Sequence, residues 1–435
     1  MKPVVKQPPR PAQVRIERVG ADGDGVGTLP DGVPVYVPFT LPNEVVTVGP
    51  TRPRGEGWLA RADSIEQVSQ ARIEAPCDYF GRCGGCALQH WREPDYADWK
   101  TGLLVAALRR AGYAEIPAVT LLRGLPGERR RLDFAVRRSH GKIILGLHSA
   151  GSGEVIDLTH CLVLHPMLMA LMTPLRTVLY GLAAIRRAAS VVINLLDSGP
   201  DVLLRTDAAL SLADRNALIS FAQAHGVPRL SWASGNAPSE PVCMFRPPVA
   251  ILSGVEVRPP PGVFLQATAA AEAAIVTAIL AGLPERMTSR SRIAELYAGC
   301  GTLTFALAGQ ARVAAWEGDA ASVSALKEAA NRAGLAGRID VTPRDLARQP
   351  LAVKELAGFA AVVLDPPHAG AAAQIVHVAA ARVPAVIYVS CNPATLLRDA
   401  RTLHAAGYTL SAVTAIDQFL WSARLETVSV FHRGA

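Results

Sequence analysis

A cysteine and several carboxylates follow short strand-forming segments in the C-terminal part of the chain. Cys391 ends the segment AVIYVSC, and Asp365 ends FAAVVLD. Glu317 ends ARVAAWE, and Asp345 follows the strand-like segment 338–342. Because the carboxyl ends of parallel strands lie at one edge of a sheet, we expect these four side chains to line one crevice. A thiol with carboxylates beside it is a candidate nucleophile with candidate bases.

One more carboxylate, Glu426, stands near the start of the last strand-like segment, RLETVSVFHR. The preceding segment, YTLSAVTAIDQF, is joined to it by a short connection, which predicts that the last strand is antiparallel. The start of an antiparallel strand lies at the same edge as the ends of the parallel ones. We therefore expect Glu426 close to Cys391. A single acid of this kind, taken alone, is more commonly a helix cap or a surface charge.

A glycine-containing turn follows the first strand of this region. RIAELYAGCGTLTFALA, residues 292–308, predicts a strand, a turn with Tyr297 and Gly299, and then a helix. Glycine lets the backbone approach a ligand at a helix N-terminus, which is how adenosyl cofactors bind in Rossmann-like sheets. In that arrangement Glu317 would accept the ribose hydroxyls, and Asp345 would lie near the adenine. The alternative is a plain strand-to-helix turn, because the complete Gly-x-Gly-x-x-Gly pattern is missing.

Residues 261–435 alternate between helix-like and strand-like patterns. The predicted order is helix 267–283, strand 292–297, helix, strand 312–317, helix, strand 338–342, strand 359–364, helix and strand 384–390, followed by the two C-terminal strands. Alternation of this kind predicts a parallel sheet with helices on both faces. The expected fold class is α/β and multidomain, with a Rossmann-like domain at 261–435.

The N-terminal part of the chain has a different pattern. After a basic, proline-rich arm at 1–12, alternating residues and glycine turns predict a small β-barrel at 9–70, of oligonucleotide-binding (OB) or SH3-like type. Residues 71–260 mix strand-like and helical segments, which predicts a central α+β domain with helices at 95–112, 166–186 and 206–225.

Three cysteines, Cys77, Cys83 and Cys86, are closely spaced in CDYFGRCGGC, and Cys161 could add a fourth ligand across a long loop. Four thiolates suit an iron–sulfur cluster or zinc, and the three-plus-one spacing favours the cluster because structural zinc usually uses two short cysteine pairs. A cluster with all four ligands is closed, so its expected role is structural or RNA-contacting. Without a secretory signal, the thiols are expected to be reduced.

The chain has 435 residues and a formal net charge of +7, and half of its residues are hydrophobic. This composition predicts folded domains and favours a polyanionic partner. RRRLDFAVRRSHGK, residues 129–142, could grip phosphates or form a solvated strand face. The most apolar stretch, from Cys161, is interrupted by two prolines and Arg176, which favours a core helix over a membrane span.

Several motifs together resemble the S-adenosyl-L-methionine (SAM)-dependent RNA uracil-C5 methyltransferases. In chain order they are CDYFGRCGGCALQHW, FLQ (264–266), ELYAGCGTLTFALA, DPPHAG, YVSCNPATLLRD and RLETVSVF. The resemblance covers nearly the whole chain, and the SCNP and DPP pair together with the cysteines is its most specific part. The family includes bacterial ribosomal-RNA and transfer-RNA 5-methyluridine enzymes. It implies an RNA-binding TRAM domain as the N-terminal barrel and a [4Fe–4S] cluster on the four cysteines.

The resemblance also implies a mechanism. Cys391 would add to C6 of uracil, C5 would take the methyl group of SAM, and Glu426 would remove the C5 proton so that the thiol leaves. Asp365 would hydrogen-bond the pyrimidine, and Gln266 would contact substrate or cofactor. The expected cofactor-binding residues are Gln266, Tyr297, Gly299, Glu317, Asp345 and Asp365.

The expected substrate is a uridine flipped out of folded RNA, because a stacked base cannot reach such a crevice. Phe264 and Phe419 are candidates to stack in its place. The chain departs from the family pattern at His368, where an arginine is usual. It also departs in FLWSARLE, where Pro-His and a later histidine are usual.

The predicted function is SAM-dependent formation of 5-methyluridine in 23S ribosomal RNA by a cytoplasmic monomer. The same chemistry on transfer RNA is one alternative, and a non-catalytic RNA-binding protein with a degenerate methyltransferase fold is another. A radical-SAM enzyme would use a Cys-x3-Cys-x2-Cys motif, whereas the first spacing here is five residues. A cytosine-C5 enzyme would place its cysteine in a different motif.

Overall fold

The computed structural model describes residues 11–434, and these form two compact units. The first unit comprises the chain up to Leu103 together with His148–Gly153 and Trp421–Arg424. The second comprises Leu104–Leu147, Glu154–Leu420 and the segment from Leu425 onward. The three-domain division expected from the sequence stays a prediction. Most of the predicted arm at 1–12 lies outside the described residues.

Five strands of the first unit close into a barrel: β1 (Ala12–Val19), β2 (Gly25–Thr28), β3 (Pro34–Val37), β5 (Gly57–Gln67) and β4 (Val45–Arg54). The side chains of β1 alternate between the barrel interior and solvent. Val14 and Ile16 are buried in the barrel core, whereas Gln13 is exposed. Gly25 is required by close packing, because a Cβ there would lie 2.1 Å from the Thr40 side chain. The small barrel predicted from the sequence is therefore confirmed.

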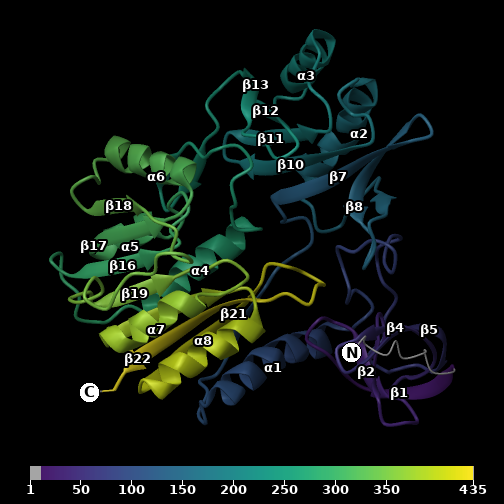
Figure 1. Ribbon diagram of the computed structural model, residues 1–435, viewed down its shortest axis with the longest axis horizontal. Coiled ribbons are helices and arrows are strands. Elements are labelled where there is room, and N and C mark those ends of the chain that lie inside the picture. The colour runs from purple at the N-terminus through teal and green to yellow at the C-terminus, as the bar shows by residue number, and fades with distance from the viewer. Residues whose placement is uncertain (1–10, 435) are drawn as a thin grey trace, which may run out of the picture. The chain divides into compact units, whose positions relative to one another are not determined.

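A seven-stranded sheet lies in the second unit. Its spatial order is β13 (Glu240–Met244), β12 (Arg229–Ser234), β11 (Gly199–Thr206), β10 (Ala188–Leu196), β7 (Arg131–Ser139), β8 (Lys142–His148) and β9 (Val155–Asp157). Helices α2 (Pro166–Gly181) and α3 (Leu212–Ala224) cover it (Figure 1). Helix α3 starts later than predicted because Ser211 and Asp214 form a capping box. Strands β14 (Ala250–Leu252) and β15 (Val255–Val257) form a separate hairpin.

An eight-stranded sheet forms the rest of the second unit. Its order is β18 (Ile339–Pro343), β17 (Arg312–Glu317), β16 (Arg292–Leu296), β19 (Ala361–Leu364), β20 (Ala385–Ser390), β22 (Glu426–Arg433), β21 (Tyr408–Asp417) and β6 (Thr120–Arg123). The first five strands are parallel, and β22 is antiparallel to both of its neighbours. The predicted parallel sheet and its antiparallel last strand are confirmed.

Strand β6 is an addition that the sequence did not reveal. It comes from the region assigned to the central domain, and it pairs in parallel with β21 at the edge of the eight-stranded sheet. Its four residues, TLLR, are too short and too exposed to carry a recognisable strand pattern. Local sequence also cannot show which sheet such an edge strand joins.

Helices cover both faces of the eight-stranded sheet (Figure 1). One core layer contains apolar residues of α4 (Ala269–Ala281), α5 (Thr304–Gln310) and α6 (Ala320–Arg332). The opposite layer contains those of α7 (Ala372–Ala381), α8 (Pro393–Ala405) and the end of α1 (Glu93–Ala111). A strand buried on both faces reads as a continuous apolar run, which explains the strong strand signal of β19 and β20.

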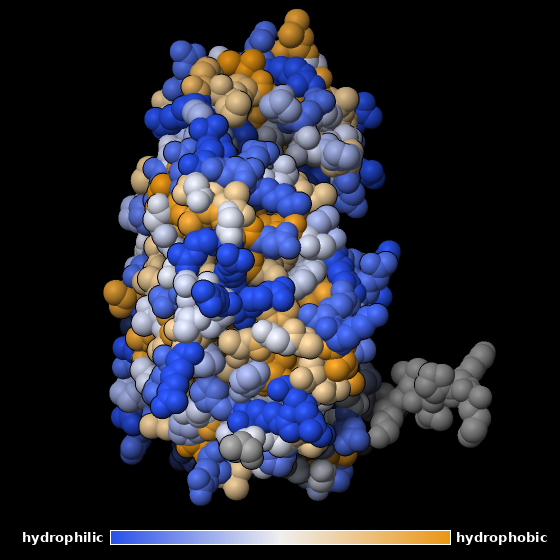
Figure 2. Space-filling view, turned by 90° about the vertical axis from the view of Figure 1, so that its left-hand side faces the viewer, coloured by the Kyte–Doolittle hydropathy of each residue, from blue (hydrophilic) through white to orange (hydrophobic). Residues whose placement is uncertain are grey.

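No helix among residues 11–434 is both long enough and apolar enough to cross a lipid bilayer. The apolar stretch after Cys161 instead contains α2, whose Leu168, Leu171 and Leu175 are buried. Figure 2 shows a face on which hydrophilic residues are interspersed with smaller apolar areas.

Candidate active site

Side chains from several strand ends meet at one edge of the eight-stranded sheet. Asp365 follows β19, Cys391 follows β20 and Tyr297 follows β16, while β17 ends at Glu317. Strand β22 runs the opposite way, so it begins with Glu426 at this same edge. The structure therefore gathers the thiol and the carboxylates at one edge, as the sequence predicted.

The register of β20 and β22 places Glu426 next to Cys391. Ser390 pairs with Thr427, and the Thr427 Oγ1 hydroxyl donates to the Ser390 carbonyl oxygen at 3.0 Å. The residues one step further along each strand are Cys391 and Glu426. Of the two groups that the proposed chemistry needs, Glu426 thus begins β22 and Cys391 directly follows the adjacent strand β20.

A chain of hydrogen bonds links the Asp365 and Glu426 carboxyl groups. Gln266 Nε2 donates to Asp365 Oδ2 at 3.3 Å. Gln418 Nε2 donates to Gln266 Oε1 at 2.9 Å and to Glu426 Oε2 at 2.8 Å, while its Oε1 accepts the Ala267 N–H at 2.8 Å. Gln266 and Gln418 are both 3% exposed, so these amides are fixed. The sequence analysis did not identify Gln418, whose one signal was its place directly after β21.

Loss of solvent raises the pKa of both carboxyl groups. For Glu426, burial is the largest cause, the nearby Asp365 carboxyl acts in the same direction, and the hydrogen bond from Gln418 lowers the pKa in part. Desolvation likewise raises the pKa of Asp365. Two close carboxylates in such a site do not both ionise readily, so the pair retains a proton toward neutral pH. It can then offer one hydrogen-bond donor and one proton acceptor.

Cys391 occupies the turn between β20 and α8. Asn392 caps that helix, because its Oδ1 accepts the Ala394 N–H at 3.0 Å. Its Nδ2 donates to the His368 carbonyl oxygen at 3.2 Å, which ties the cysteine turn to the Asp-Pro-Pro-His loop. Cys391 is half-buried and lies two residues before the first residue of α8.

A buried network around Asp399 holds the same two loops together. Asp399 Oδ2 accepts the Tyr388 hydroxyl at 2.6 Å and the Ala371 N–H at 2.8 Å. Arg398 Nε donates to Asp399 Oδ1 at 2.7 Å. Asp399 is fully buried, so its charge is balanced by these donors. The network joins the second turn of α8 to β20 and to the N-cap residue of α7.

Tyr297 and Gly299 form a tight turn after β16. Their φ angles are 67° and 56°, and apart from its chain neighbours a Cβ on Gly299 would meet no atom within 4 Å. Gly299 N donates to Glu317 Oε2 at 2.8 Å, and Asp319 N donates to Glu317 Oε1 at 2.8 Å. The turn therefore combines a strained backbone with open space and a fixed carboxylate, as expected for an adenosyl-cofactor site.

Asp345 lies beside this turn, as predicted, but its carboxylate is used locally. A Cβ on Gly318 would be 3.6 Å from Asp345 Cα, so the two backbones are adjacent. Asp345 Oδ1 accepts the N–H groups of Ala347 at 3.0 Å and Arg348 at 3.3 Å. A role at the adenine is therefore the least supported of the predicted cofactor contacts.

Glu295 on β16 is another buried carboxyl, which the sequence analysis missed. It is 1% exposed, and neither of its carboxyl oxygens has a hydrogen-bond partner. Burial raises its pKa to about 8, and the Asp365 and Glu317 carboxyls act in the same direction. The nearby Thr304 hydroxyl offsets part of this rise without reaching hydrogen-bond geometry. The sequence did not reveal this burial, because one acidic residue in an otherwise apolar strand forms no repeating pattern.

Replacing Glu295 with glutamine should stabilise the protein at alkaline pH. The unfolded carboxyl ionises near pH 4.5 and the folded one near pH 8, so unfolding releases a proton between these values and stability falls as pH rises. The stability of Glu295→Gln relative to the original protein should therefore increase by roughly 4 kcal/mol from about pH 5 to about pH 9. Urea titrations at both pH values measure this difference. A difference that does not change with pH would contradict the assignment.

The basic segment 129–142 is only partly available to a polyanion. Arg130 Nη2 pairs with Glu272 Oε2 at 2.5 Å, and Arg138 donates to carbonyl oxygens at the end of α2. Arg137 is exposed. Arg130 and Arg138 therefore stabilise the fold, and only part of this run presents charge to solvent.

The cysteine loop belongs to the first unit and Cys161 to the second. Within the loop, burial is the largest cause of a raised pKa of Cys83, and the nearby Cys77 adds to it. Among residues 11–434, no three His, Cys, Asp or Glu side chains gather closely enough to hold a metal ion. The cluster site on Cys77, Cys83, Cys86 and Cys161 that the sequence predicted therefore stays a prediction. Spacing limits which cysteines could meet, but loop conformation decides whether they do.

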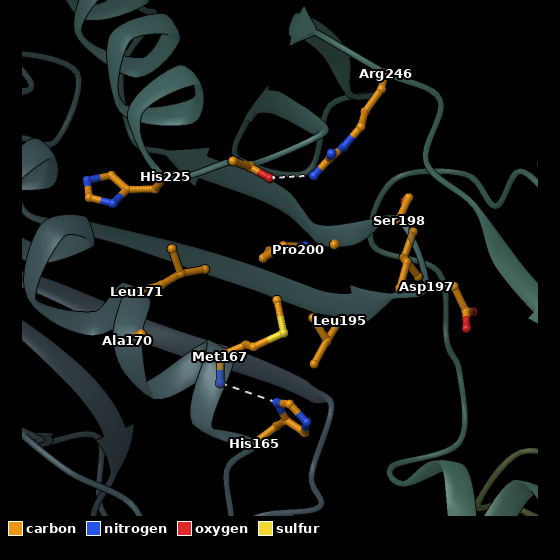
Figure 3. Close-up of a pocket in the computed structure, with 13 residues that line it drawn as sticks. His165, Met167, Ala170, Leu171, Leu195, Asp197, Ser198, Pro200, His225 and Arg246 are labelled. Carbon is orange, nitrogen blue, oxygen red and sulfur yellow. Dashed lines mark hydrogen bonds between the residues drawn. The ribbon is translucent and has the colours of Figure 1, made fainter.

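A cavity of about 580 Å³ lies in the second unit near the β10–β11 turn and the start of α2 (Figure 3). Figure 3 shows Arg246, whose Nη2 donates to the Gly226 carbonyl oxygen at 3.1 Å, and His165, whose Nδ1 accepts the Met167 N–H at 3.2 Å. Both side chains thus form hydrogen bonds with backbone groups. No candidate catalytic or cofactor residue lines this cavity, so it lies outside the site described above.

Comparison with known proteins agrees with this geometry. The family model described as tRNA (Uracil-5-)-methyltransferase matches residues 344–433. A Brucella melitensis protein named as an uncharacterized RNA methyltransferase is 38% identical over 422 residues, which are 97% of this chain and 98% of that protein. The 23S rRNA (uracil(1939)-C(5))-methyltransferase RlmD of Pectobacterium atrosepticum is 32% identical, over 98% of this chain and 94% of its own. The chain belongs to the RNA uracil-C5 methyltransferase family.

This RNA uracil-C5 methyltransferase also shares its fold with a solved structure. The tRNA (uracil-54, C5)-methyltransferase of Pyrococcus abyssi, in complex with S-adenosyl-L-homocysteine, matches it with a TM-score of 0.70 and 17% identity. The match covers 97% of this chain and 100% of that chain. The resemblance recognised from the motifs is thereby confirmed.

The segment of this methyltransferase that departs from the family pattern has its own anchoring. Within the first unit, the Trp421 carbonyl oxygen accepts the N–H groups of Ala87 at 2.8 Å and Leu88 at 3.0 Å. Trp421 N donates to the Tyr96 hydroxyl at 2.9 Å, and Lys100 Nζ donates to the Arg424 carbonyl oxygen at 2.8 Å. Backbone bonds therefore hold the segment that precedes Glu426.

Proposed function

We propose that this enzyme uses SAM to convert a uridine of RNA into 5-methyluridine, with Cys391 as nucleophile and Glu426 as base. The observation that supports this proposal best is the sheet edge at which Cys391 directly follows β20 and Glu426 begins the adjacent strand β22, together with the Gln266–Asp365 hydrogen bond. A glycine turn with a fixed carboxylate lies at the same edge. This combination supplies each group that C5 methylation requires.

The chemistry follows from the weak nucleophilicity of uracil C5. The Cys391 thiolate adds to C6, which forms an Sγ–C6 bond and an enolate. SAM, when bound, would supply an electrophilic methyl group: a C5–CH3 bond would form as the sulfonium S–CH3 bond breaks, and S-adenosyl-L-homocysteine would leave. Glu426 then removes the C5 proton, the C5–C6 double bond forms again, and the Sγ–C6 bond breaks. Cys391 returns as a thiolate, and the proton resides on Glu426.

Asp365 and Gln266 are proposed to hold the pyrimidine ring. A carboxyl with a raised pKa retains its proton near neutral pH, so Asp365 can donate a hydrogen bond to the ring as negative charge develops on it. Gln266 directs its Nε2 toward Asp365, and an amide nitrogen has two N–H donors. The second N–H is thus available for substrate or cofactor.

Glu317 is proposed to bind SAM through the ribose hydroxyls, with Tyr297 and Gly299 forming the adjacent wall. Replacing Glu317 with alanine should weaken SAM binding about 10- to 100-fold, because a charge-assisted hydrogen bond and the anchor of the Gly299 turn are both lost. Isothermal titration with SAM measures the change. Glu328→Gln on the exposed face of α6 is the control, and an unchanged affinity in Glu317→Ala would refute the assignment.

The proposed substrate is 23S ribosomal RNA, with transfer RNA as the alternative. The relative RlmD, which matches nearly the whole chain, favours ribosomal RNA. A flipped-out uridine is expected, and Phe264 is suited to stack on a base because it is 61% exposed with the Arg131 guanidinium 5.3 Å from its ring centroid. The barrel and the exposed Arg137 are proposed to hold flanking RNA.

Two measurements test this function. The purified enzyme should transfer labelled methyl groups from SAM to RNA that lacks the modification. Mass spectrometry of nuclease fragments from a deletion strain should show one missing 5-methyluridine in 23S RNA. A missing methyl in transfer RNA would move the proposal to that substrate. No transfer to any cellular RNA would instead favour a non-catalytic RNA-binding protein.

The iron–sulfur cluster that the family resemblance implies stays a prediction, and no step of the proposed mechanism passes through it. Iron and acid-labile sulfide in anaerobically purified protein decide whether it is present. About four of each per chain would establish a cluster of the [4Fe–4S] type.

A further inference from the structure

Gln418 stands at the branch point of the hydrogen bonds around the candidate site. It follows β21 directly, is 3% exposed, and uses all of its polar atoms in three bonds. Its Oε1 accepts the Ala267 N–H at 2.8 Å, and its Nε2 donates to Gln266 Oε1 at 2.9 Å and Glu426 Oε2 at 2.8 Å. No atom of this amide remains for substrate, so any effect on catalysis is exerted through its partners.

The orientation of the Gln418 amide is determined by its partners. The Ala267 N–H is a donor only, so the atom facing it must be the oxygen. The nitrogen then faces Glu426 and Gln266 Oε1, both of which are acceptors. This arrangement in turn fixes Gln266 with its nitrogen toward Asp365. One glutamine therefore sets the direction of hydrogen bonding on both sides of the site.

We propose that Gln418 is a positioning residue for methyl transfer, which holds Glu426 and Gln266 in fixed orientations relative to Asp365. The inference rests on the proposed function, because it assigns the base role to Glu426. Gln418 is not a catalytic residue, since its contacts are to protein groups. Its donated hydrogen bond favours the charged form of Glu426, which is the form that accepts the C5 proton.

The neighbours of Glu426 explain why this donor matters. The charged or titratable groups near this end of the neighbouring strands include Cys391 after β20, Asp365 after β19 and Asp417 at the end of β21. Tyr388 of β20, Tyr408 of β21, and His432 and Arg433 of β22 lie further along the same strands. The nearby Asp365 carboxyl opposes ionisation of Glu426, and burial opposes it further. The Gln418 Nε2 amide donates a side-chain hydrogen bond to Glu426 that opposes both effects.

Replacing Gln418 with methionine tests the proposal, because methionine keeps the volume and removes the donor. We expect turnover on RNA to fall about 10- to 100-fold, as for other groups that lose their alignment. The rise of activity with pH should also move to higher pH, because Glu426 loses a bond to its charged form. With ordinary RNA, methylated RNA bound covalently to Cys391 should accumulate, since the step that slows is removal of the C5 proton.

Gln374→Met is the matched control. Gln374 is a fully buried glutamine of α7 whose amide bonds on both sides to the Leu351 backbone, at 2.7 and 3.3 Å, away from the carboxyl groups. It should change thermal stability without moving the pH profile. Gln418→Glu adds a second test, because a glutamate there can donate only while protonated. Its activity should therefore fall at higher pH, where the original enzyme is most active.

The outcomes separate this inference from the proposed function. If the original enzyme transfers no methyl group to RNA, the proposed function fails. If the original enzyme is active and Gln418→Met keeps its turnover and pH profile, only the positioning role is wrong. If Gln418→Met does not fold, as judged by circular dichroism beside Gln374→Met, the pH profile of Gln418→Glu decides, and an unchanged profile overturns the inference.

Discussion

Replacing Cys391 with alanine should reduce methyl transfer to RNA by about 10⁴-fold or more, because no other group at the sheet edge can add to uracil C6. Cys391 is half-buried, so losing its sulfur removes little packing, and the fold should be retained. SAM affinity should be unchanged, since the glycine turn and Glu317 are untouched. Transfer of labelled methyl groups to RNA from a deletion strain measures the loss.

A covalent trap makes the Cys391 test sharper. RNA containing 5-fluorouridine cannot lose a C5 proton, so the original enzyme with SAM should form an adduct that survives denaturing electrophoresis, and Cys391→Ala should form none. Cys243→Ala, which changes a half-buried cysteine of β13, is the control and should form the adduct normally. Turnover by Cys391→Ala near the original rate would remove the basis of the proposed mechanism.

Replacing Glu426 with glutamine should slow turnover about 10²- to 10⁴-fold, the usual contribution of a positioned base. Glutamine keeps the shape and still offers an oxygen to the Gln418 Nε2 donor, so the hydrogen-bond chain can persist. Addition of Cys391 and methyl transfer do not need the base, whereas elimination does. Methylated RNA attached to the protein should therefore accumulate with ordinary RNA, and labelled methyl on a denaturing gel detects it.

The pH dependence identifies Glu426 independently. A base accepts a proton only when ionised, and the pKa of this carboxyl is raised by burial and by Asp365. Activity of the original enzyme should thus increase with pH in a range well above that of an ordinary glutamate, and this increase should disappear in Glu426→Gln. Glu328→Gln, on the exposed side of α6, should keep it. Release of RNA by Glu426→Gln at the original rate would show that another group removes the proton.

Most of the eight-stranded sheet could be predicted from the sequence, because its central strands are buried on both faces. β19 and β20 are unbroken apolar runs, and each is followed by a polar residue, so both their positions and their ends are visible. β6 could not be predicted, since four partly exposed residues at a sheet edge carry no periodic signal. Local pattern also cannot assign such a strand to one of two sheets.

Some residues of the candidate site could likewise be predicted from sequence patterns, whereas others were revealed only by the packing of the folded chain. Cys391, Asp365 and Glu317 end recognisable strands, and strand direction alone predicts that they share an edge with Glu426. The roles of Gln418 and Glu295 could not be predicted from the sequence, because they depend on the burial of these side chains and on their hydrogen-bond partners. The four-cysteine site stays a prediction, because spacing alone cannot show whether cysteines from two units meet.

The sequence by itself determined the alternation of strands and helices, and with it the residues that stand at strand ends. It also indicated the family, because its motifs resemble the family's signatures in order. Only the tertiary structure decided which of these groups are desolvated and how the Gln266 and Gln418 amides are oriented. The physical reason is that proton affinity and hydrogen-bond direction depend on neighbours from distant parts of the chain. The Gln418 amide, for example, lies 2.8 Å from the Ala267 N–H and 2.9 Å from Gln266 Oε1, although more than 100 residues separate them in the chain.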